Sequence, residues 1–273
     1  MARQIKRQMW NKAWNQAFET RDPQVVTSVL PEILSAASST SNLQERAYSL
    51  LAAATCYAIL GDQTLARRTL DEAKTVAITG DRIFEAHADF QEALYRGSQG
   101  HSQASLEILD RVLTEYAQEL KQPELRYLYE QALFSKGISL AQLRRCDEAR
   151  QFLTKARDFD LAHHDRAVLE FHLGECFLMA NEDESALRSF VTAKSIGLGA
   201  EWQAMLYYYI GRAHYRLKQY RLAKHELLES EKHLKVGIQA PSAPDLYKLL
   251  SYCCLALHQD AEAEMYSRLA KPA

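Results

Sequence analysis

The sequence predicts an all-α protein that is assembled from stacked copies of one helical unit. Three glycines recur 37 residues apart, and each is followed twelve residues later by an alanine: Gly137, Gly174 and Gly211, then Ala149, Ala186 and Ala223. A fixed period with small residues in phase is typical of repeat architectures. Only six prolines and ten glycines interrupt the 273 residues, so long stretches of helix-forming residues run without a breaker.

The first copy is expected over residues 3–38 and opens with an aromatic stripe. Trp10, Trp14 and Phe18 recur every four residues, as on the buried edge of a helix. Asp22 and Pro23 then form an N-cap and first-turn pair, which predicts the start of a second helix. Because no apolar run follows the basic residues, this segment does not predict a secretory signal.

Two degenerate copies follow at 43–78 and 82–120. In the first, the residues in phase are Leu50, Ala54, Tyr57, Ala66, Leu70 and Ala73, with Gly61-Asp62 as the turn. In the second they are Phe90, Ala93, Ser105, Leu109 and Val112, and the turn holds Gly97 and Gly100. Each copy therefore predicts two helices that are joined by a short turn.

Three clear copies span 130–162, 167–199 and 204–236. Each has a glycine among large residues, followed by a large residue between two small ones: Leu133, Gly137, Leu140, Ala149, Leu153 and Ala156; Leu173, Gly174, Phe177, Ala186, Phe190 and Ala193; Tyr207, Gly211, His214, Ala223, Leu227 and Ser230. Large residues at spacings of three and four give the first helix of each pair a buried stripe. The glycine lets the second helix approach, and the large residue between the small ones fills the space beside it.

A last copy is expected over 244–271, where Ser251, Cys254, Ala263 and Ala270 keep the phase. Atypical copies are typical of the ends of a stack, because one of their faces meets solvent. The stretches between copies are too short to separate independent domains. We therefore predict a single solenoid domain over residues 1–273.

The clear copies resemble the tetratricopeptide repeat, with its pattern W-x-x-L-G-x-x-Y followed by A-x-x-x-F and a second alanine. The resemblance covers nearly the whole chain and is most specific in its second half. It implies a right-handed α-α superhelix of about seven antiparallel helix pairs. The period of 37 instead of 34 residues, and the absence of the closing proline from the clear copies, imply longer helices and looser connections.

In this geometry the first helix of each pair presents a stripe to the concave surface of the superhelix. The stripe contains the residue three before the glycine position and those one and four after it. The candidate partner-binding residues on it or at its margins are Phe90, Phe134, Phe171, His172, Glu175, Tyr208, Arg212, Tyr215, Arg216, Lys248 and Tyr252. Aromatic rings offer apolar area there, and the basic residues could hold carboxylates of a peptide.

Two interpretations of the aromatic residues stay open. In one, rings such as Phe90, Phe134 and Phe171 line a peptide groove. In the other, they pack against the next helix and contact no ligand. The tyrosines are better placed for binding, because their hydroxyls require water or a partner. Aromatic ladders also serve self-association, so a homodimer is a further use of the same surface.

The sequence favours neither a metal site nor a catalytic centre. His172 and Glu175 lie three residues apart, a spacing that could ligate a metal, but no second pair and no H-E-x-x-H motif accompany them. No G-x-S-x-G motif, phosphate-binding glycine loop or recognisable pair of catalytic carboxylates occurs. We expect no cofactor, and we interpret His172 and Glu175 as a polar pair of the groove.

The net charge and the cysteine content limit the classes of partner and the cellular compartment that the sequence predicts. The formal net charge of -2 gives no reason to expect nucleic acid or an anionic membrane, and no run of eighteen apolar residues predicts a membrane span. Residues 210–235 carry seven Lys or Arg against three Glu, which either meets an acidic partner or is a solvated helix face. Five cysteines without C-x-x-C spacing predict buried thiols and a reducing, cytoplasmic location.

Two functions follow from these expectations. The first is a non-enzymatic interaction module or scaffold, which holds a peptide or partner helix in the groove. The alternative is a regulatory sensor, whose curvature shifts when a peptide or small effector binds and which acts with a transcription regulator.

Overall fold

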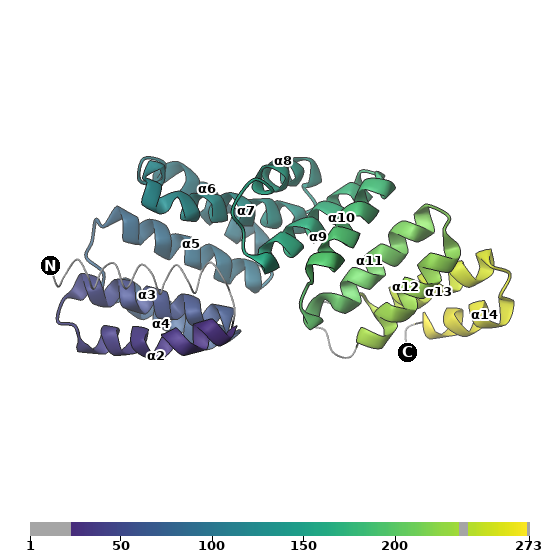
Figure 1. Ribbon diagram of the computed structural model, residues 1–273, viewed down its shortest axis with the longest axis horizontal. Helices are drawn as coiled ribbons and strands as arrows, with labels where there is room; N and C mark the ends of the chain where they lie inside the picture. Colours follow the sequence, from purple (N-terminus) through teal and green to yellow (C-terminus); the bar gives the residue numbers. More distant parts are fainter. Residues whose placement is uncertain (1–22, 235–239, 272–273) are drawn as a thin grey trace. The chain divides into compact units, whose positions relative to one another are not determined.

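The computed structural model describes residues 23–234 and 240–271 (Figure 1). Within these two stretches the chain forms α-helices and short 3-10 helices that are joined by turns, and no strand. The predicted all-α class is confirmed. The aromatic stripe expected at Trp10, Trp14 and Phe18, and the N-cap expected at Asp22, lie outside the described residues.

The chain divides into two compact units, and each is described by itself. Unit 1 comprises residues 1–143 with 158–162. Its described α-helices are α2 (Pro23–Ser39), α3 (Leu43–Ile59), α4 (Gln63–Val76), α5 (Arg82–Ser98), α6 (Ser102–Glu115) and α7 (Arg126–Gln142). Two 3-10 helices precede α7: η1 (Glu119–Lys121) and η2 (Pro123–Leu125).

Unit 2 comprises residues 144–157 with 163–273. Its helices are α8 (Cys146–Ala156), α9 (His163–Met179), α10 (Asp183–Ile196), η3 (Ala200–Trp202), α11 (Gln203–Arg216), α12 (Tyr220–His233), α13 (Ala243–Ala256) and α14 (Asp260–Leu269). The division falls within the copy predicted at 130–162, because α7 belongs to unit 1 and α8 to unit 2. The single solenoid domain stays a prediction.

Several helix starts follow from capping residues in the sequence. Pro23 lies at the N-terminal end of the described part of α2. The side chain of Asn42 accepts from Gln44 N before α3, and that of Asp62 accepts from Leu65 N before α4. These side chains satisfy amide groups that have no partner within the helix.

The turn between paired helices repeats one backbone conformation. In unit 1, Gly61 and Gly100 have φ values of 82° and 78°. In unit 2 the corresponding turns place non-glycine residues at φ values of 59° to 62°: Arg144, Asn181, Lys218 and His258. Glycine adopts this left-handed conformation most easily. The turns of unit 2 keep the same conformation, although other residues replace the glycine that would mark the turn in the sequence.

Two glycines of the clear copies, Gly174 and Gly211, mark close helix crossings, as predicted. A Cβ atom built on Gly174 of α9 would lie 2.6 Å from Cε1 of Phe190 on α10. A Cβ on Gly211 of α11 would lie 2.7 Å from Cγ of Leu227 on α12. The small residues on either side of these large residues are fully buried, so the second helix packs directly against the first.

The degenerate copies keep this arrangement with other small residues. Ala54 and Leu70 lie in one hydrophobic cluster of unit 1, and Ala93 and Leu109 lie in another. In α13 the hydroxyl of Ser251 donates to the carbonyl of Ala263 at 2.9 Å. A buried hydroxyl is thus satisfied at a position where other copies have glycine.

We predict that Gly174→Ala lowers the free energy of unfolding by about 1–3 kcal/mol, because the added methyl group overpacks against Phe190. Urea unfolding followed by circular dichroism measures the change. The matched control is Gly97→Ala in α5, where a Cβ would be 3.4 Å from Ser105 Oγ, an ordinary contact. Equal stability of the two variants would contradict close packing at the α9–α10 crossing.

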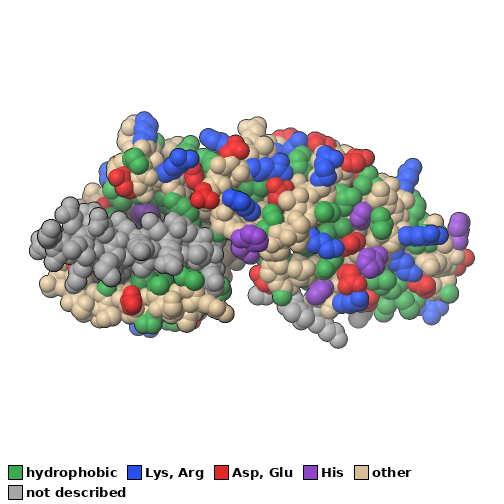
Figure 2. Space-filling view, viewed as in Figure 1, with side chains coloured by type: hydrophobic (Ala, Val, Ile, Leu, Met, Phe, Trp, Pro, Cys, Tyr) green, Lys and Arg blue, Asp and Glu red, His purple; other side chains and the backbone are tan. Residues whose placement is uncertain are grey.

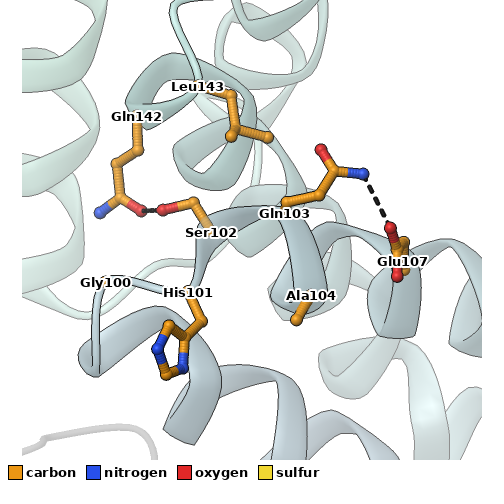
Figure 3. Close-up of a pocket in the computed structure, with 8 residues that line it drawn as sticks. All are labelled: Gly100, His101, Ser102, Gln103, Ala104, Glu107, Gln142 and Leu143. Atoms are coloured by element: carbon orange, nitrogen blue, oxygen red, sulfur yellow. Dashed lines mark hydrogen bonds between the residues drawn. The ribbon is translucent and has the colours of Figure 1, made fainter.

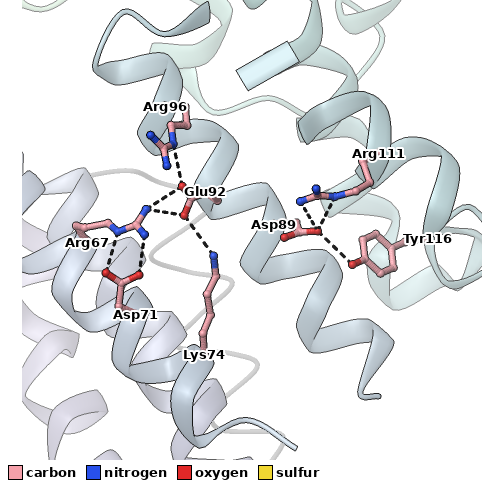
Figure 4. Close-up of polar contacts among 8 residues, drawn as sticks. All are labelled: Arg67, Asp71, Lys74, Asp89, Glu92, Arg96, Arg111 and Tyr116. Atoms are coloured by element: carbon pink, nitrogen blue, oxygen red, sulfur yellow. Dashed lines mark hydrogen bonds and ion pairs between the residues drawn. The ribbon is translucent and has the colours of Figure 1, made fainter. Parts of the chain in front are cut away.

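A network of ion pairs joins α4 to α5 in unit 1 (Figure 4). Glu92 on α5 has a side chain that is only 10% exposed, and it accepts from three cations. Arg67 Nη1 is 2.6 Å, Arg96 Nε 2.9 Å and Lys74 Nζ 3.2 Å from its carboxylate oxygens. Burial alone would raise the pKa of Glu92, but Arg67 and Lys74 outweigh it and lower the pKa to about 2.

We predict that Glu92 makes the fold sensitive to acid. Its pKa is about 2 in the folded protein, against an ordinary value of 4.5, so its contribution is complete above pH 4.5 and disappears as the pH falls toward 2. Glu92→Gln should therefore destabilise the protein at pH 7 and flatten the dependence of its unfolding free energy on pH across that window. Urea titrations at several pH values measure both effects.

The control for this experiment is Glu264→Gln, which removes an ion pair whose two side chains are 73% and 66% exposed. Exposed pairs contribute little, so this variant should resemble the wild type. An unchanged acid slope in Glu92→Gln would show that other carboxylates carry the acid sensitivity.

Candidate functional site

Three of the predicted groove rings are buried. Phe90, Phe134 and Phe171 are 1%, 3% and 2% exposed. Phe90 belongs to a hydrophobic cluster of unit 1, and the ring of Phe171 lies 5.2 Å from that of Trp202 and 5.6 Å from that of Tyr209. Phe90 and Phe171 thus pack inside a unit, which agrees with the packing that the second interpretation expects. None of the three rings has the exposed area that a groove residue needs.

The other predicted residues lie on the first helices of three consecutive pairs in unit 2. α9 contacts α11, and α11 contacts α13. Seven of these residues keep solvent exposure, and we name six of them, all but Arg216, the unit-2 surface: Glu175, Tyr208, Arg212, Tyr215, Lys248 and Tyr252. His172 is 4% exposed, so it supports this surface from beneath.

Glu175 is held as a carboxylate by its neighbours. His172 Nδ1 is 2.8 Å from Glu175 Oε2, and the hydroxyl of Tyr209 also donates to this carboxylate. Burial alone would raise the pKa of Glu175, but these contacts outweigh it, and the pKa lies below its ordinary value. The Glu175 side chain remains 26% exposed, so a ligand can still reach it.

Arg212 and Arg216 lie on the same helix but have different surroundings. Arg216 Nε is 2.9 Å from Asp183 Oδ1, and Arg216 Nη1 donates to the carbonyl of Leu178 at 2.7 Å. Its guanidinium is thus engaged within unit 2, and its contact with a ligand carboxylate stays a prediction. Arg212 is half-buried beside Tyr208 and Tyr209, and it has no ion pair with any residue that the structure describes.

The tyrosines extend the surface from α11 to α13. The rings of Tyr215 and Tyr252 lie 6.3 Å apart, and Tyr252 is 42% exposed. Lys248 Nζ is 6.0 Å from the centre of the Tyr252 ring. Tyr208 is half-buried, and burial raises its pKa. This end of the surface combines apolar area with a positive charge.

The basic stretch at 210–235 is partly neutralised within unit 2. Arg216 pairs with Asp183, Lys224 with Glu262, and Lys232 with Glu229. Figure 2 shows basic and acidic side chains interspersed over the visible face of this unit. Three of the seven basic residues of this stretch are therefore balanced by acidic residues of unit 2.

Most of the cysteine side chains are buried. Cys56, Cys176, Cys253 and Cys254 are buried, as predicted, whereas Cys146 is partly exposed. Burial raises the pKa of Cys56 to about 11 and that of Cys253 to about 12, so both stay protonated at neutral pH. Across residues 23–234 and 240–271, no three His, Cys, Asp or Glu side chains gather where they could hold a metal ion.

Unit 1 has an open depression of about 510 Å³ where α6 begins and α7 ends (Figure 3). Ser102 Oγ donates to Gln142 Oε1 at 2.6 Å, and Gln103 Nε2 donates to Glu107 Oε1 at 2.9 Å. These contacts join side chains of the wall to one another.

Sequence reasoning missed the residues that organise the α9 end of the surface. Tyr209 bonds to Glu175 and stacks on Phe190, with ring centres 5.4 Å apart. Trp202 packs on Phe171 and lies 6.1 Å from the ring of His172. The run of three tyrosines at 207–209 was a signal, because a helix cannot place three consecutive rings on one face.

No family model and no curated protein matches this sequence. The described residues contain no helix with both the length and the apolar character that crossing a membrane requires.

Solved structures share the fold. The apo form of the quorum sensor NprR from B. thuringiensis is similar, with a TM-score of 0.75 and 16% identity over 96% of this chain and 74% of that chain. A Rap protein complexed with Competence and Sporulation Factor gives a TM-score of 0.71 and 13% identity over 96% and 75%. The pilF protein of Pseudomonas aeruginosa gives 0.58 and 16% over 82% and 90%. By its fold, this chain is a tetratricopeptide-like helical repeat protein.

Proposed function

We propose that the protein is a non-enzymatic interaction module, which binds an extended peptide or protein segment through the unit-2 surface. The observation that carries the proposal is Arg212, a half-buried residue whose guanidinium has no ion pair among the described residues. A carboxylate from a ligand would give this guanidinium a charge-assisted hydrogen bond. Tyr215 and Tyr252 next to it provide rings for apolar contacts.

The structural comparisons support a peptide as the ligand. NprR has also been crystallised in complex with its cognate peptide NprX. That structure resembles this protein with a TM-score of 0.72 and covers 97% of this chain. At 15% identity the likeness concerns the fold, so binding is transferred to this chain as a proposal only.

The second candidate function is a regulatory sensor, which the likeness to the quorum sensor NprR favours. In a sensor, a bound peptide changes the equilibrium between two arrangements of the helices. In a passive module it changes only the helices that it touches. Hydrogen exchange with and without a bound peptide distinguishes the two: protection limited to α9, α11 and α13 supports a module, and altered exchange in α3–α6 supports a sensor.

We predict that peptides selected from a random twelve-residue display library on this protein bind the unit-2 surface. Arg212→Ala with Tyr252→Ala should weaken their binding at least about tenfold, because a charge-assisted contact and an exposed ring are both lost. Fluorescence anisotropy with labelled peptides measures the dissociation constants.

The control is Arg221→Ala, which removes an exposed basic residue of α12 outside this surface. It should leave binding unchanged, and circular dichroism checks that all variants are folded. Undiminished binding by the double variant would move the binding site elsewhere. Light scattering in the same experiment measures the molecular mass, because homodimerisation stays a prediction that concerns the same surface.

A further inference from the structure

The repeat places three different side chains at one equivalent position of α9, α11 and α13. This position follows the crossing residue of each pair, which is Gly174, Gly211 or Ser251. Glu175, Arg212 and Tyr252 occupy it, and we name them the row. Because α9 contacts α11 and α11 contacts α13, a chain that runs across these helices meets an anion, a cation and an aromatic ring in order.

The anionic end of the row is prepared for an external charge. His172 and Tyr209 both donate to the Glu175 carboxylate, which fixes its orientation. Neither donor is a Lys or Arg side chain, the Arg144 guanidinium acts on Glu175 only as a nearby charge, and 26% of the Glu175 side chain remains exposed. Other carboxylates of unit 2 differ in this respect: Glu170 accepts from Arg157 at 2.8 Å, and Glu182 accepts from Arg150 at 2.9 Å.

The middle and the far end of the row are also open to a ligand. Arg212 has no carboxylate partner in the described part of unit 2, although Arg216 one turn later binds Asp183. Tyr252 is 42% exposed and lies beside the ring of Tyr215. The row therefore offers opposite charges on adjacent helices, followed by apolar area.

We propose that the row reads a charge order in its ligand: a Lys or Arg opposite Glu175, an Asp or Glu opposite Arg212, and an aromatic or large apolar residue opposite Tyr252. This inference rests on the proposed function. Packed helices lie about 8–10 Å apart, and a ligand in the polyproline II conformation rises about 3.1 Å per residue with three residues per turn, so ligand residues three positions apart face the row together. The matching peptide is K-x-x-E-x-x-F, or the same order read from the other end.

Fluorescein-labelled synthetic peptides test the order directly. K-x-x-E-x-x-F and F-x-x-E-x-x-K are compared with the charge-exchanged E-x-x-K-x-x-F and F-x-x-K-x-x-E, all with Ser and Ala as spacers. We expect the better of the first two to bind at least about tenfold more tightly than either exchanged peptide, because like charges would face each other in the latter. Equal affinities of matched and exchanged peptides would overturn the proposal.

Two protein variants assign the preference to its residues. Arg212→Gln should remove the discrimination against a ligand Lys opposite α11, and Glu175→Gln should remove the discrimination against a ligand Glu opposite α9. Arg221→Gln, outside the row, should leave the preference intact. Both row variants could instead bind the matched and the exchanged peptides more weakly by the same factor. That result would show that neither residue discriminates between charges in the ligand.

Failure of this inference differs from failure of the proposed function. Library-selected peptides could bind through Arg212 and Tyr252 while none of the four synthetic peptides binds measurably. In that case the proposed charge order is wrong, and the proposed binding surface is still supported. If the selected peptides are insensitive to Arg212→Ala with Tyr252→Ala, the surface is wrong and the inference falls with it.

Discussion

Two helices can cross at short range only where one of them has little or no side chain at the contact, and this requirement organises the second half of the chain. At Gly174 and Gly211 the space of a missing Cβ is filled by Phe190 and Leu227. The small residue and the filling residue keep the same spacing in each pair, so both pairs adopt the same register. A shared register then places equivalent side chains on equivalent faces of successive helices.

The crossings use one stripe of each first helix and leave the adjacent stripe for other contacts. Much of the charge of unit 2 is used to join neighbouring helices, as between Arg216 and Asp183, Arg157 and Glu170, or Lys194 and Glu226. Arg212 is an exception in the described part of this unit. Because Tyr208 and Tyr215 beside it are partly exposed, the same register that builds the fold also places the residues of the proposed binding surface.

The fold was predictable because its determinants are close in sequence. Glycine and the residue that fills its space are sixteen positions apart in both clear pairs, and this spacing survives as a sequence signal. The equivalent turns at Asn181 and Lys218 were not recognisable, because residues other than glycine adopt the left-handed conformation there. The division between α7 and α8 had no signal in composition or in loop length.

The site was predictable only in part, because position on a helix does not decide exposure. Phe171 and Tyr208 occupy equivalent positions, yet Trp202 and Tyr209 cover Phe171, and Tyr208 stays partly open. Arg212 and Arg216 are one turn apart, and only the location of Asp183 on another helix separates their roles. Such contacts depend on which side chains the neighbouring helix supplies, and periodicity does not carry that information.

The most direct test of the unit-2 surface is a crystal structure of the protein with a library-selected peptide. The account predicts electron density for an extended chain across α9, α11 and α13, with a peptide carboxylate within hydrogen-bond distance of the Arg212 guanidinium. A peptide bound to α12 and α14, or to unit 1, with Arg212 unpaired as before, would contradict it.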